Sequence, residues 1–283
     1  MRDSIAIVTG ATDGIGRQTA LGLAERGAEV LIVGRDAAKV QTTVLDLKAE
    51  SGNGRIAGET ADLASIAEVG ALAGRLNARF PRIDILVNNA GGYFASRRQT
   101  VDGLEHTFAL NHLAYANLTA LLLDRLKAAP AARIVNVASG VHRGVALQFD
   151  DLQMARRFDG WLAYRRSKLM NVMYTYALAR RLAGTGATAN VLHPGFVRSK
   201  FGHNNGGLRS LGMQVAQRLG AISLQAGAAT SLHVATDPVL AGVTGRYFER
   251  SRQVESSPQS HDEAAQERLW QETEALLRQH QPA

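Results

Sequence analysis

Tyr164 and Lys168 are the two residues of this chain whose types and spacing most directly suggest chemistry. They stand four positions apart, in Tyr164-Arg165-Arg166-Ser167-Lys168, so a helix would place the phenol and the ammonium group on one face. A free tyrosine has a pKa of about 10, and a neighbouring positive charge stabilises the phenolate and lowers that pKa. Tyr164 is therefore a candidate general acid and base. A tyrosine and a lysine on a solvated helix face would share this spacing, so other motifs must support the interpretation.

A glycine-rich segment near the N-terminus has the pattern of a phosphate-binding turn. It follows the apolar residues 5–8, precedes a helical pattern, and reads Thr9-Gly10-Ala11-Thr12-Asp13-Gly14-Ile15-Gly16. After a strand, such a turn directs backbone N–H groups and the positive end of a helix toward an anion, as a pyrophosphate site requires. The spacing G-x-x-x-G-x-G differs from the G-x-G-x-x-G dinucleotide fingerprint, and the glycines could also mark only a tight turn.

Several further motifs follow in order along the chain. They are Asp62-Leu63, Asn88-Asn89-Ala90-Gly91, Asn111-His112-Leu113, Ser139 after an apolar strand pattern, and His193-Pro194-Gly195-Phe196-Val197. With the glycine-rich turn and the tyrosine–lysine pair, they resemble the short-chain dehydrogenase/reductase family over nearly the whole chain. Within that family, the sequence is most similar to the retinol dehydrogenase-like group and its bacterial relatives.

Apolar strand patterns alternate with helical patterns from one end of the chain to the other. The expected strands cover residues 5–8, 29–33, 55–61, 85–87, 133–137, 188–192 and 246–248. The alternation predicts an α/β fold, a single-domain doubly wound (Rossmann-type) parallel sheet of about seven strands with helices on both faces. Ligands of such sheets bind beyond the carboxyl ends of the strands, where Gly10, Asn88 and Ser139 fall. Ser260 and Glu263 have the spacing of a capping box before a last amphipathic helix.

The resemblance implies a catalytic set of Asn111, Ser139, Tyr164 and Lys168. Ser139 would hydrogen-bond the substrate oxygen, and Tyr164 would exchange a proton with it. Lys168 would lower the pKa of the phenol and bond the nicotinamide ribose. The backbone of Asn111, at a helix irregularity, would hold a water molecule, whereas the neighbouring His112 is expected to be structural. Ser139 and Tyr164 are 25 positions apart, farther than in many family members, so their approach in space is an assumption.

The resemblance also implies a dinucleotide site along the same edge of the sheet. Its expected residues are Gly10, Thr12, Asp13, Gly14, Ile15, Gly16, Arg35, Asp62, Leu63, Asn89, Ala90, Gly91, Tyr164, Lys168, Pro194, Gly195, Val197 and Ser199. Arg35 follows the second strand, where an acidic residue would accept the adenosine ribose hydroxyls. Since an arginine can pair with a 2′-phosphate, NADP(H) is favoured over NAD(H). Asp36 could instead accept ribose hydroxyls or pair with Arg35.

Composition narrows the classes of function. The 283 residues are 46% hydrophobic and include no cysteine, which excludes disulfides, thiolate zinc sites and cysteine nucleophiles, and we expect no metal site. The net charge of +7 comes from scattered arginines, so nucleic acid is not an expected partner. No apolar run approaches the ~18 residues of a membrane helix, and the first strand leaves no room for a signal peptide. We expect a cytoplasmic protein without stable membrane insertion.

These features predict an NADP-dependent oxidoreductase that interconverts a carbonyl and an alcohol on a small apolar substrate. The apolar residues expected near the catalytic positions are Phe94, Val141, Phe149 and Trp161, with Phe196, Phe201, Leu208 and Leu211 in and after a glycine-rich segment. That segment, at about 198–222, would cover the substrate. Family members often form a homo-oligomer. The alternatives are a non-catalytic NADP-binding sensor on the same fold, light-dependent protochlorophyllide reduction and nucleic-acid binding.

Overall fold

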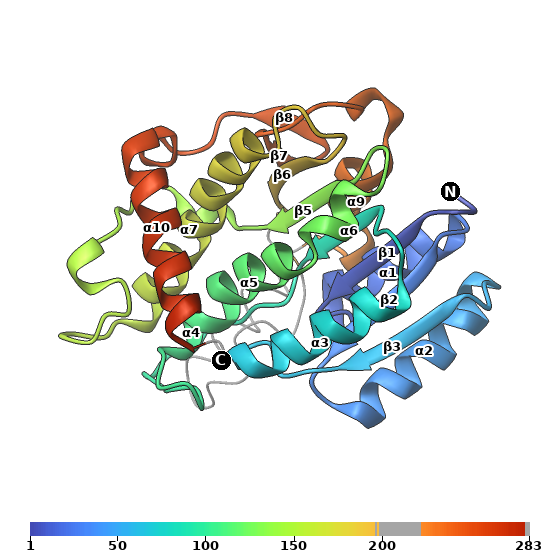
Figure 1. Ribbon diagram of the computed structural model, residues 1–283, viewed down its shortest axis with the longest axis horizontal. Coiled ribbons are helices and arrows are strands. Elements are labelled where there is room, and N and C mark those ends of the chain that lie inside the picture. Colours follow the sequence, from blue (N-terminus) through green and yellow to red (C-terminus); the bar gives the residue numbers. More distant parts are fainter. Residues whose placement is uncertain (196, 198–221, 281–283) are drawn as a thin grey trace.

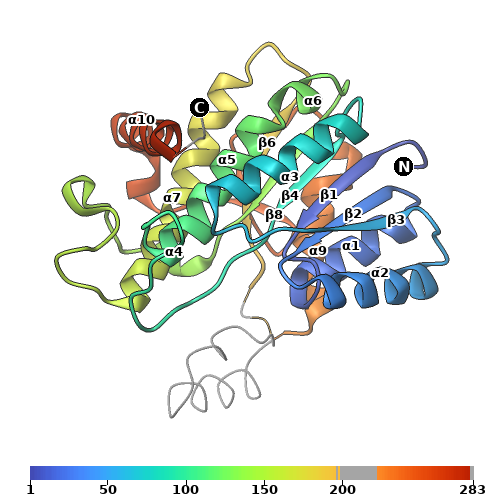
Figure 2. The ribbon, with the colours of Figure 1, turned by 60° about the horizontal axis from the view of Figure 1, so that its bottom comes forward.

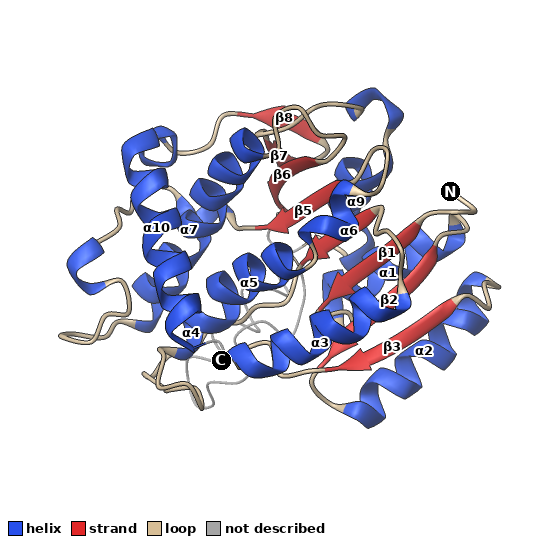
Figure 3. Cartoon of the chain, viewed as in Figure 1, coloured by secondary structure: helices blue, strands red, loops and turns tan. Residues whose placement is uncertain are grey.

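One twisted sheet forms the centre of the protein (Figures 1 and 3). The computed structural model describes residues 1–195, 197 and 222–280. The strands are β1 (Ile5–Thr9), β2 (Glu29–Gly34), β3 (Ile56–Thr60), β4 (Ile85–Asn88), β5 (Arg133–Val137), β6 (Thr188–His193), β7 (Tyr247–Glu249) and β8 (Arg252–Val254). Their order is β3-β2-β1-β4-β5-β6-β7-β8, and all neighbours pair in parallel except β7 and β8. The predicted doubly wound parallel sheet is confirmed.

The eighth strand is the difference from the prediction. β8 is antiparallel to β7, and a tight turn at Arg250 and Ser251, both at positive φ, joins the two strands. β8 has three residues and exposes Arg252 and Gln253, so it has no apolar run by which its sequence could be recognised. By contrast, the central strands β1, β2, β4 and β5 are almost entirely buried, as expected for strands that are covered on both faces.

Helices cover both faces of the sheet. The longer ones are α1 (Gly14–Glu25), α2 (Ala37–Ser51), α3 (Ile66–Arg79), α5 (Ala114–Leu121), α7 (Gly160–Arg181), α9 (Leu224–Thr236) and α10 (Glu263–His280). Figure 2 shows α1, α2 and α9 on one side of the sheet and α3, α5 and α7 on the other. Short helices α4 (His106–Phe108) and α6 (Leu123–Lys127) flank α5, and a π-helix, η1 (Ala109–Leu113), joins α4 to α5.

The C-terminal helix α10 packs across α7 (Figure 1). Trp270 stacks on Tyr174 of α7, with 5.0 Å between ring centroids and 5° between planes, and the Arg181 guanidinium lies 4.1 Å from the Trp270 ring. The predicted helix is therefore present, but the predicted cap is wrong. Ser260 donates its hydroxyl to the Ser257 carbonyl instead, and Asp262 accepts from the Ala265 N–H at the helix start.

The segment expected to cover the substrate lies almost entirely outside the described residues. Only Ile222 of the range 198–222 is described, where it bridges Val197. Ser199 and the apolar residues Phe196, Phe201, Leu208 and Leu211 are likewise outside that part of the chain. The single domain over residues 1–283 stays a prediction. No helix among the described residues is long and apolar enough to cross a membrane.

Candidate active site

The glycine-rich turn after β1 has two glycines at positive φ, so its backbone is not covered by side chains at these positions. Gly10 has φ +63°, and a Cβ there would lie 2.7 Å from the Ala90 Cα. Gly14, at φ +60°, begins α1, and the Asp13 carboxylate accepts from the Gly14 N–H at 2.8 Å. Side chains at these positions would therefore be strained or would collide with the neighbouring strand end. The turn leaves the N-terminus of α1 open to an anionic ligand.

Asn89 fastens the end of β4 to this turn. Its backbone N–H donates to Thr9 Oγ1 at 2.9 Å, and its side-chain amide donates to the Thr9 and Gly10 carbonyls at 2.9 and 3.2 Å. A Cβ at Gly16 would lie only 2.4 Å from the Asn89 amide nitrogen. Asn89 thus contributes to the site by fixing two backbone segments, which agrees with the expectation that this region approaches a ligand through its backbone.

A cavity of about 540 Å³ runs along the carboxyl ends of the strands. The predicted site residues that line it are Gly10, Thr12, Asp13, Gly14, Ile15, Gly16, Arg35, Asp62, Leu63, Asn89, Ala90, Gly91, Tyr164, Lys168 and Pro194. Phe94, which was expected near the catalytic positions, also lines it. No signal in the sequence pointed to Lys39, Gly92, His106, Leu110 and Val137, which line it as well. Gly195 and Val197 are not part of the lining. Val197 is buried and packs toward Gly227 of α9.

Arg35 and Asp36 lie at the end of β2 with different roles. The Asp36 carboxylate accepts from the Lys39 N–H at 3.0 Å and caps the N-terminus of α2. Arg35 is exposed at the cavity, and it forms none of the ion pairs found among the described residues. The alternative in which Asp36 pairs with Arg35 is therefore not seen, and the guanidinium is one of the charged groups that line the cavity, together with Asp36, Lys39 and Asp62.

Ser139, Tyr164 and Lys168 meet at the opposite end of the cavity. The Ser139 hydroxyl lies close enough to the Tyr164 phenol to lower its pKa. Lys168 Nζ donates to the Val137 carbonyl at 2.9 Å and lies 5.6 and 5.8 Å from the ring centroids of Tyr115 and Tyr164. Lys168 is only 4% exposed, and burial lowers its pKa to about 7.

The pKa of Tyr164 departs from the sequence-based expectation. Burial raises it above the ordinary value, and the hydrogen bond from Ser139 opposes that rise only in part. Lys168 is itself destabilised as a cation by burial, and its Nζ is directed to the Val137 carbonyl. Desolvation of the phenolate therefore outweighs attraction to the lysine, and Tyr164 holds its proton at neutral pH.

Asn111 lies within the π-helix η1, at the helix irregularity that the resemblance implied. Its side chain is fully buried, donates to the Gly92 carbonyl and to Ser167 Oγ at 3.0 and 2.9 Å, and accepts from the Gly92 N–H at 2.9 Å. A Cβ at Gly91 would lie 3.0 Å from Asn111 Oδ1 and 3.4 Å from Lys168 Nζ. Asn111 therefore connects the strand-end glycines to the helix that carries Tyr164 and Lys168.

His112 faces away from this site. It is fully buried, its Nε2 lies 2.9 Å from Thr273 Oγ1 of α10, and burial lowers its pKa to about 4. A neutral imidazole that faces α10 fits the expected structural role.

Arg165 and Arg166 hold the segment that follows Ser139 against the helix that carries Tyr164, although Ser139 and Tyr164 are far apart in the sequence. Arg165 donates from Nε to the Val141 carbonyl at 3.1 Å and from Nη2 to the Arg143 carbonyl at 2.8 Å. Arg166 Nε donates to the Ala146 carbonyl at 3.1 Å. The two arginines of the Tyr164 motif therefore hold the chain that follows Ser139 against α7. Their roles were missed from the sequence because the contacts join positions about 20 residues apart, for which spacing gives no signal.

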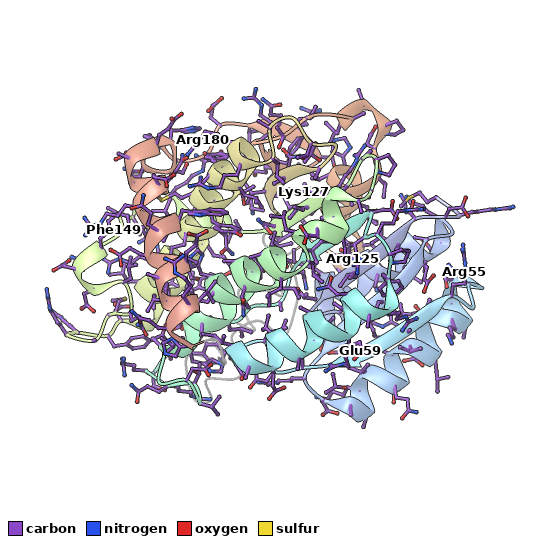
Figure 4. The ribbon with its side chains drawn as sticks, in the orientation of Figure 1. Arg55, Glu59, Arg125, Lys127, Phe149 and Arg180 are labelled. Carbon is purple, nitrogen blue, oxygen red and sulfur yellow. The ribbon has the colours of Figure 1, made fainter. Side chains whose placement is uncertain are left out.

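Aromatic side chains lie around Tyr164, and Phe94 is the one among Tyr93, Phe94 and Trp161 that lines the cavity. Trp161 stacks on Tyr164 at 5.8 Å, and Tyr93 meets Trp161 edge-on at 5.8 Å. Trp161 is 41% exposed. Phe149, by contrast, lies beside α10 (Figure 4), where its ring is 4.5 Å from the Arg268 guanidinium, so we interpret it as part of the packing of α10.

The arginines labelled in Figure 4 do not form a common basic surface. Figure 4 shows Arg55, Arg125 and Arg180 well apart on different elements. Across residues 1–195, 197 and 222–280, no three His, Asp or Glu side chains gather closely enough to hold a metal ion.

Known proteins share this fold and its motifs. The profile of the short chain dehydrogenase family matches residues 4–209. Retinol dehydrogenase 13 from Homo sapiens is 38% identical over 278 residues, which cover 96% of this chain and 83% of the relative. Retinol dehydrogenase 14 from Mus musculus is 36% identical over 290 residues, with coverage of 98% and 86%.

Solved structures agree with these matches. A protein from Mycobacterium paratuberculosis superposes with a TM-score of 0.79 and 28% identity, covering 99% of this chain and 96% of that chain. The NADP complex of RhlG from Pseudomonas aeruginosa superposes with a TM-score of 0.69 and 28% identity, with coverage of 92% and 96%. The chain belongs to the short-chain dehydrogenase family, which uses nicotinamide cofactors for alcohol and carbonyl redox chemistry. Within that family it falls in the retinol dehydrogenase-like group.

Proposed function

We propose that this protein is an NADP(H)-dependent oxidoreductase that interconverts a carbonyl and an alcohol on an apolar substrate, with Tyr164 as general acid and base. The observation that carries the proposal is the arrangement of the cavity. Its one end has the glycine-rich turn and Arg35, and its other end has Tyr164, in contact with Ser139 and Lys168. A dinucleotide has phosphates at one part and a reactive nicotinamide ring at another. The glycine-rich turn and Arg35 suit the phosphates, and Tyr164 suits a substrate that reacts with the ring.

The residues at the cavity fit NADP(H). Gly10 and Gly14 both have positive φ, so neither position takes a side chain without strain, and a pyrophosphate could approach the bare backbone at the start of α1. Arg35 supplies a planar cation for a 2′-phosphate, whereas the Asp36 carboxylate is occupied as a helix cap and is less suited to accept ribose hydroxyls. The NADP complex of RhlG supports the same choice. Lys168 would bind the nicotinamide ribose.

The chemistry divides between cofactor and protein. When bound, the nicotinamide supplies or accepts the hydride. Ser139 would hold the substrate oxygen by a hydrogen bond, beside the phenol that it already contacts. A phenol is protonated at neutral pH even at its ordinary pKa of about 10, and burial raises the pKa of Tyr164 further, so the phenol can donate to a carbonyl oxygen during reduction. In oxidation, the phenolate form of Tyr164 would accept the proton of the alcohol, and higher pH favours that form.

The aromatic side chains around Tyr164 support an apolar substrate. Tyr93, Phe94 and Trp161 present ring surface beside Tyr164, and Trp161 remains substantially exposed. Covering such surface contributes about 25 cal/mol per Å². Retinol, in the names of the relatives, is an apolar alcohol of this kind. A cytoplasmic location and a homo-oligomer stay predictions.

A panel of aldehydes, ketones and alcohols tests the proposal. Each is incubated with NADPH or NADP⁺, and turnover is followed by the absorbance of the reduced nicotinamide. We expect turnover of ring-bearing or medium-chain carbonyls that Tyr164→Phe removes. Tight NADPH binding without turnover of any compound would favour the sensor and would contradict the enzyme.

A further inference from the structure

We infer that His142 is a positioning residue, which sets the backbone of Ser139 so that the serine hydroxyl meets Tyr164. His142 Nδ1 lies 2.7 Å from the Ser139 carbonyl oxygen, and Nε2 lies 3.1 Å from the Ser257 backbone nitrogen. Since the role of Ser139 in catalysis is part of the proposed function, the inference rests on that function. It assigns a task to a residue that lies outside the cavity lining.

The two ring nitrogens of His142 have fixed and different roles. A backbone N–H can only donate, so Nε2 accepts from Ser257 and carries no proton. Nδ1 then carries the proton and donates it to the Ser139 carbonyl, which can only accept. His142 is fully buried, and burial lowers its pKa to about 4, which keeps the ring neutral. With both nitrogens occupied, His142 has no free position for proton exchange with a substrate.

The bond from His142 acts on the peptide group that follows Ser139. The Ser139 carbonyl also accepts from the backbone N–H of His142, at 3.2 Å, in the 3₁₀ turn η2 (Gly140–His142). Two donors from one residue fix the plane of this peptide, and that plane sets the direction in which the Ser139 side chain leaves the backbone. A small rotation here would move the hydroxyl relative to Tyr164, whose pKa the hydroxyl lowers.

Ser257 connects the turn to the catalytic helix. Its neighbour Ser256 lies 2.7 Å, hydroxyl to hydroxyl, from Tyr176, which belongs to α7 together with Tyr164. Arg143 donates to the Glu255 carbonyl, so the turn and residues 255–257 are joined at two points. The position of Ser139 relative to α7 is therefore fixed from this C-terminal segment, independently of the contacts that Arg165 makes on the other side of the turn.

Two substitutions separate the two bonds of His142. The amide nitrogen of asparagine occupies nearly the place of Nδ1, so His142→Asn retains the donor to Ser139 and loses the acceptor for Ser257. Glutamine places its amide near Nε2, so His142→Gln retains the acceptor and loses the side-chain bond to Ser139, while the backbone N–H bond remains. His261→Gln is the matched control, because His261 Nε2 bonds Ser256 in the same segment without contact to Ser139.

The experiment measures kcat, KM and NADPH affinity for these variants, with kcat normalised to NADPH-binding sites so that unfolded protein does not count. We expect His142→Gln to lower kcat about 5- to 30-fold, as the loss of one buried hydrogen bond implies, with unchanged NADPH affinity. His142→Asn should keep kcat within about threefold of the wild type, and His261→Gln should match the wild type, because both retain the bond to Ser139.

The same measurements in a Ser139→Ala background decide how His142 acts. If it acts through the serine, His142→Gln has no further effect on kcat in that background. Three results would overturn the inference. They are an equal fall in kcat for His142→Gln in both backgrounds, an equal loss of kcat for His142→Asn and His142→Gln, and a wild-type kcat for His142→Gln. A wild-type kcat for Ser139→Ala would instead contradict the proposed function, since the serine itself would then be dispensable.

Discussion

Replacing Lys168 by methionine should change how the stability of the protein depends on pH. The lysine is 4% exposed, and burial lowers its pKa from 10.5 to about 7. Methionine has a similar length and no charge, so the variant removes the titration and preserves most of the packing. The comparison isolates the cost of placing this ammonium group in the interior.

The sign and size of the effect follow from linkage. Between the folded pKa of about 7 and the unfolded value of 10.5, the unfolded chain binds more protons at Lys168 than the folded chain does. The free energy of unfolding of the wild type therefore rises with pH in this window, by at most about 1.4 kcal/mol per pH unit. From pH 7 to pH 9 the gain relative to Lys168→Met is about 2 kcal/mol once the curvature near pH 7 is included.

Urea unfolding of both proteins at pH 6, 7, 8 and 9 measures this difference. We expect the stability of the wild type relative to Lys168→Met to be constant below about pH 6 and to increase above pH 7. A difference that stays flat from pH 6 to pH 9 would show that Lys168 keeps an ordinary pKa, and the description of a desolvated lysine beside Tyr164 would be wrong.

Three further substitutions test Arg35 at the cavity, Trp161 beside Tyr164, and Trp270 of the C-terminal helix. Arg35→Ala should weaken NADPH binding roughly 10- to 150-fold and NADH binding little, because only NADPH offers a 2′-phosphate; equal losses in a titration with both cofactors would refute this. Trp161→Ala should lower kcat/KM about tenfold for a ring-bearing carbonyl but not for acetaldehyde, since only the larger substrate covers the ring; a uniform loss would contradict it. Trp270→Ala should destabilise the fold by about 2–4 kcal/mol in urea, because the stacking on Tyr174 is lost, whereas Arg278→Ala should cost less than about 0.5.

The strands at the centre of the sheet were predictable because burial on both faces requires apolar runs. β1 and β5 begin where the sequence indicated, at Ile5 and Arg133, and their ends carry the candidate residues. Those runs predicted that the glycine-rich turn and Ser139 would lie at one edge of the sheet, whereas the approach of Ser139 to Tyr164 was only an assumption. β8 was missed because three residues with exposed polar side chains have no such pattern.

Other features depend on the packing of distant segments. The spacing of Tyr164 and Lys168 predicted their proximity. Whether the pKa of Tyr164 is raised or lowered depends on burial, which cannot be read from that spacing. Asp36 caps the N-terminus of α2, and this local role was not considered when the sequence suggested that Asp36 could accept ribose hydroxyls. The contact of His142 with Ser257 joins residues 115 positions apart, so only the fold reveals it.

The central claim, that Tyr164 transfers the proton, is tested most directly by Tyr164→Phe. The variant keeps the ring that stacks on Trp161 and lacks only the hydroxyl, so NADPH affinity should remain near that of the wild type. Single-turnover reduction of the best carbonyl of the panel, with NADPH in excess, should slow by at least ~10² and up to ~10⁴, as expected for loss of general acid catalysis. A variant that binds NADPH normally and reduces the carbonyl at the wild-type rate would contradict the account.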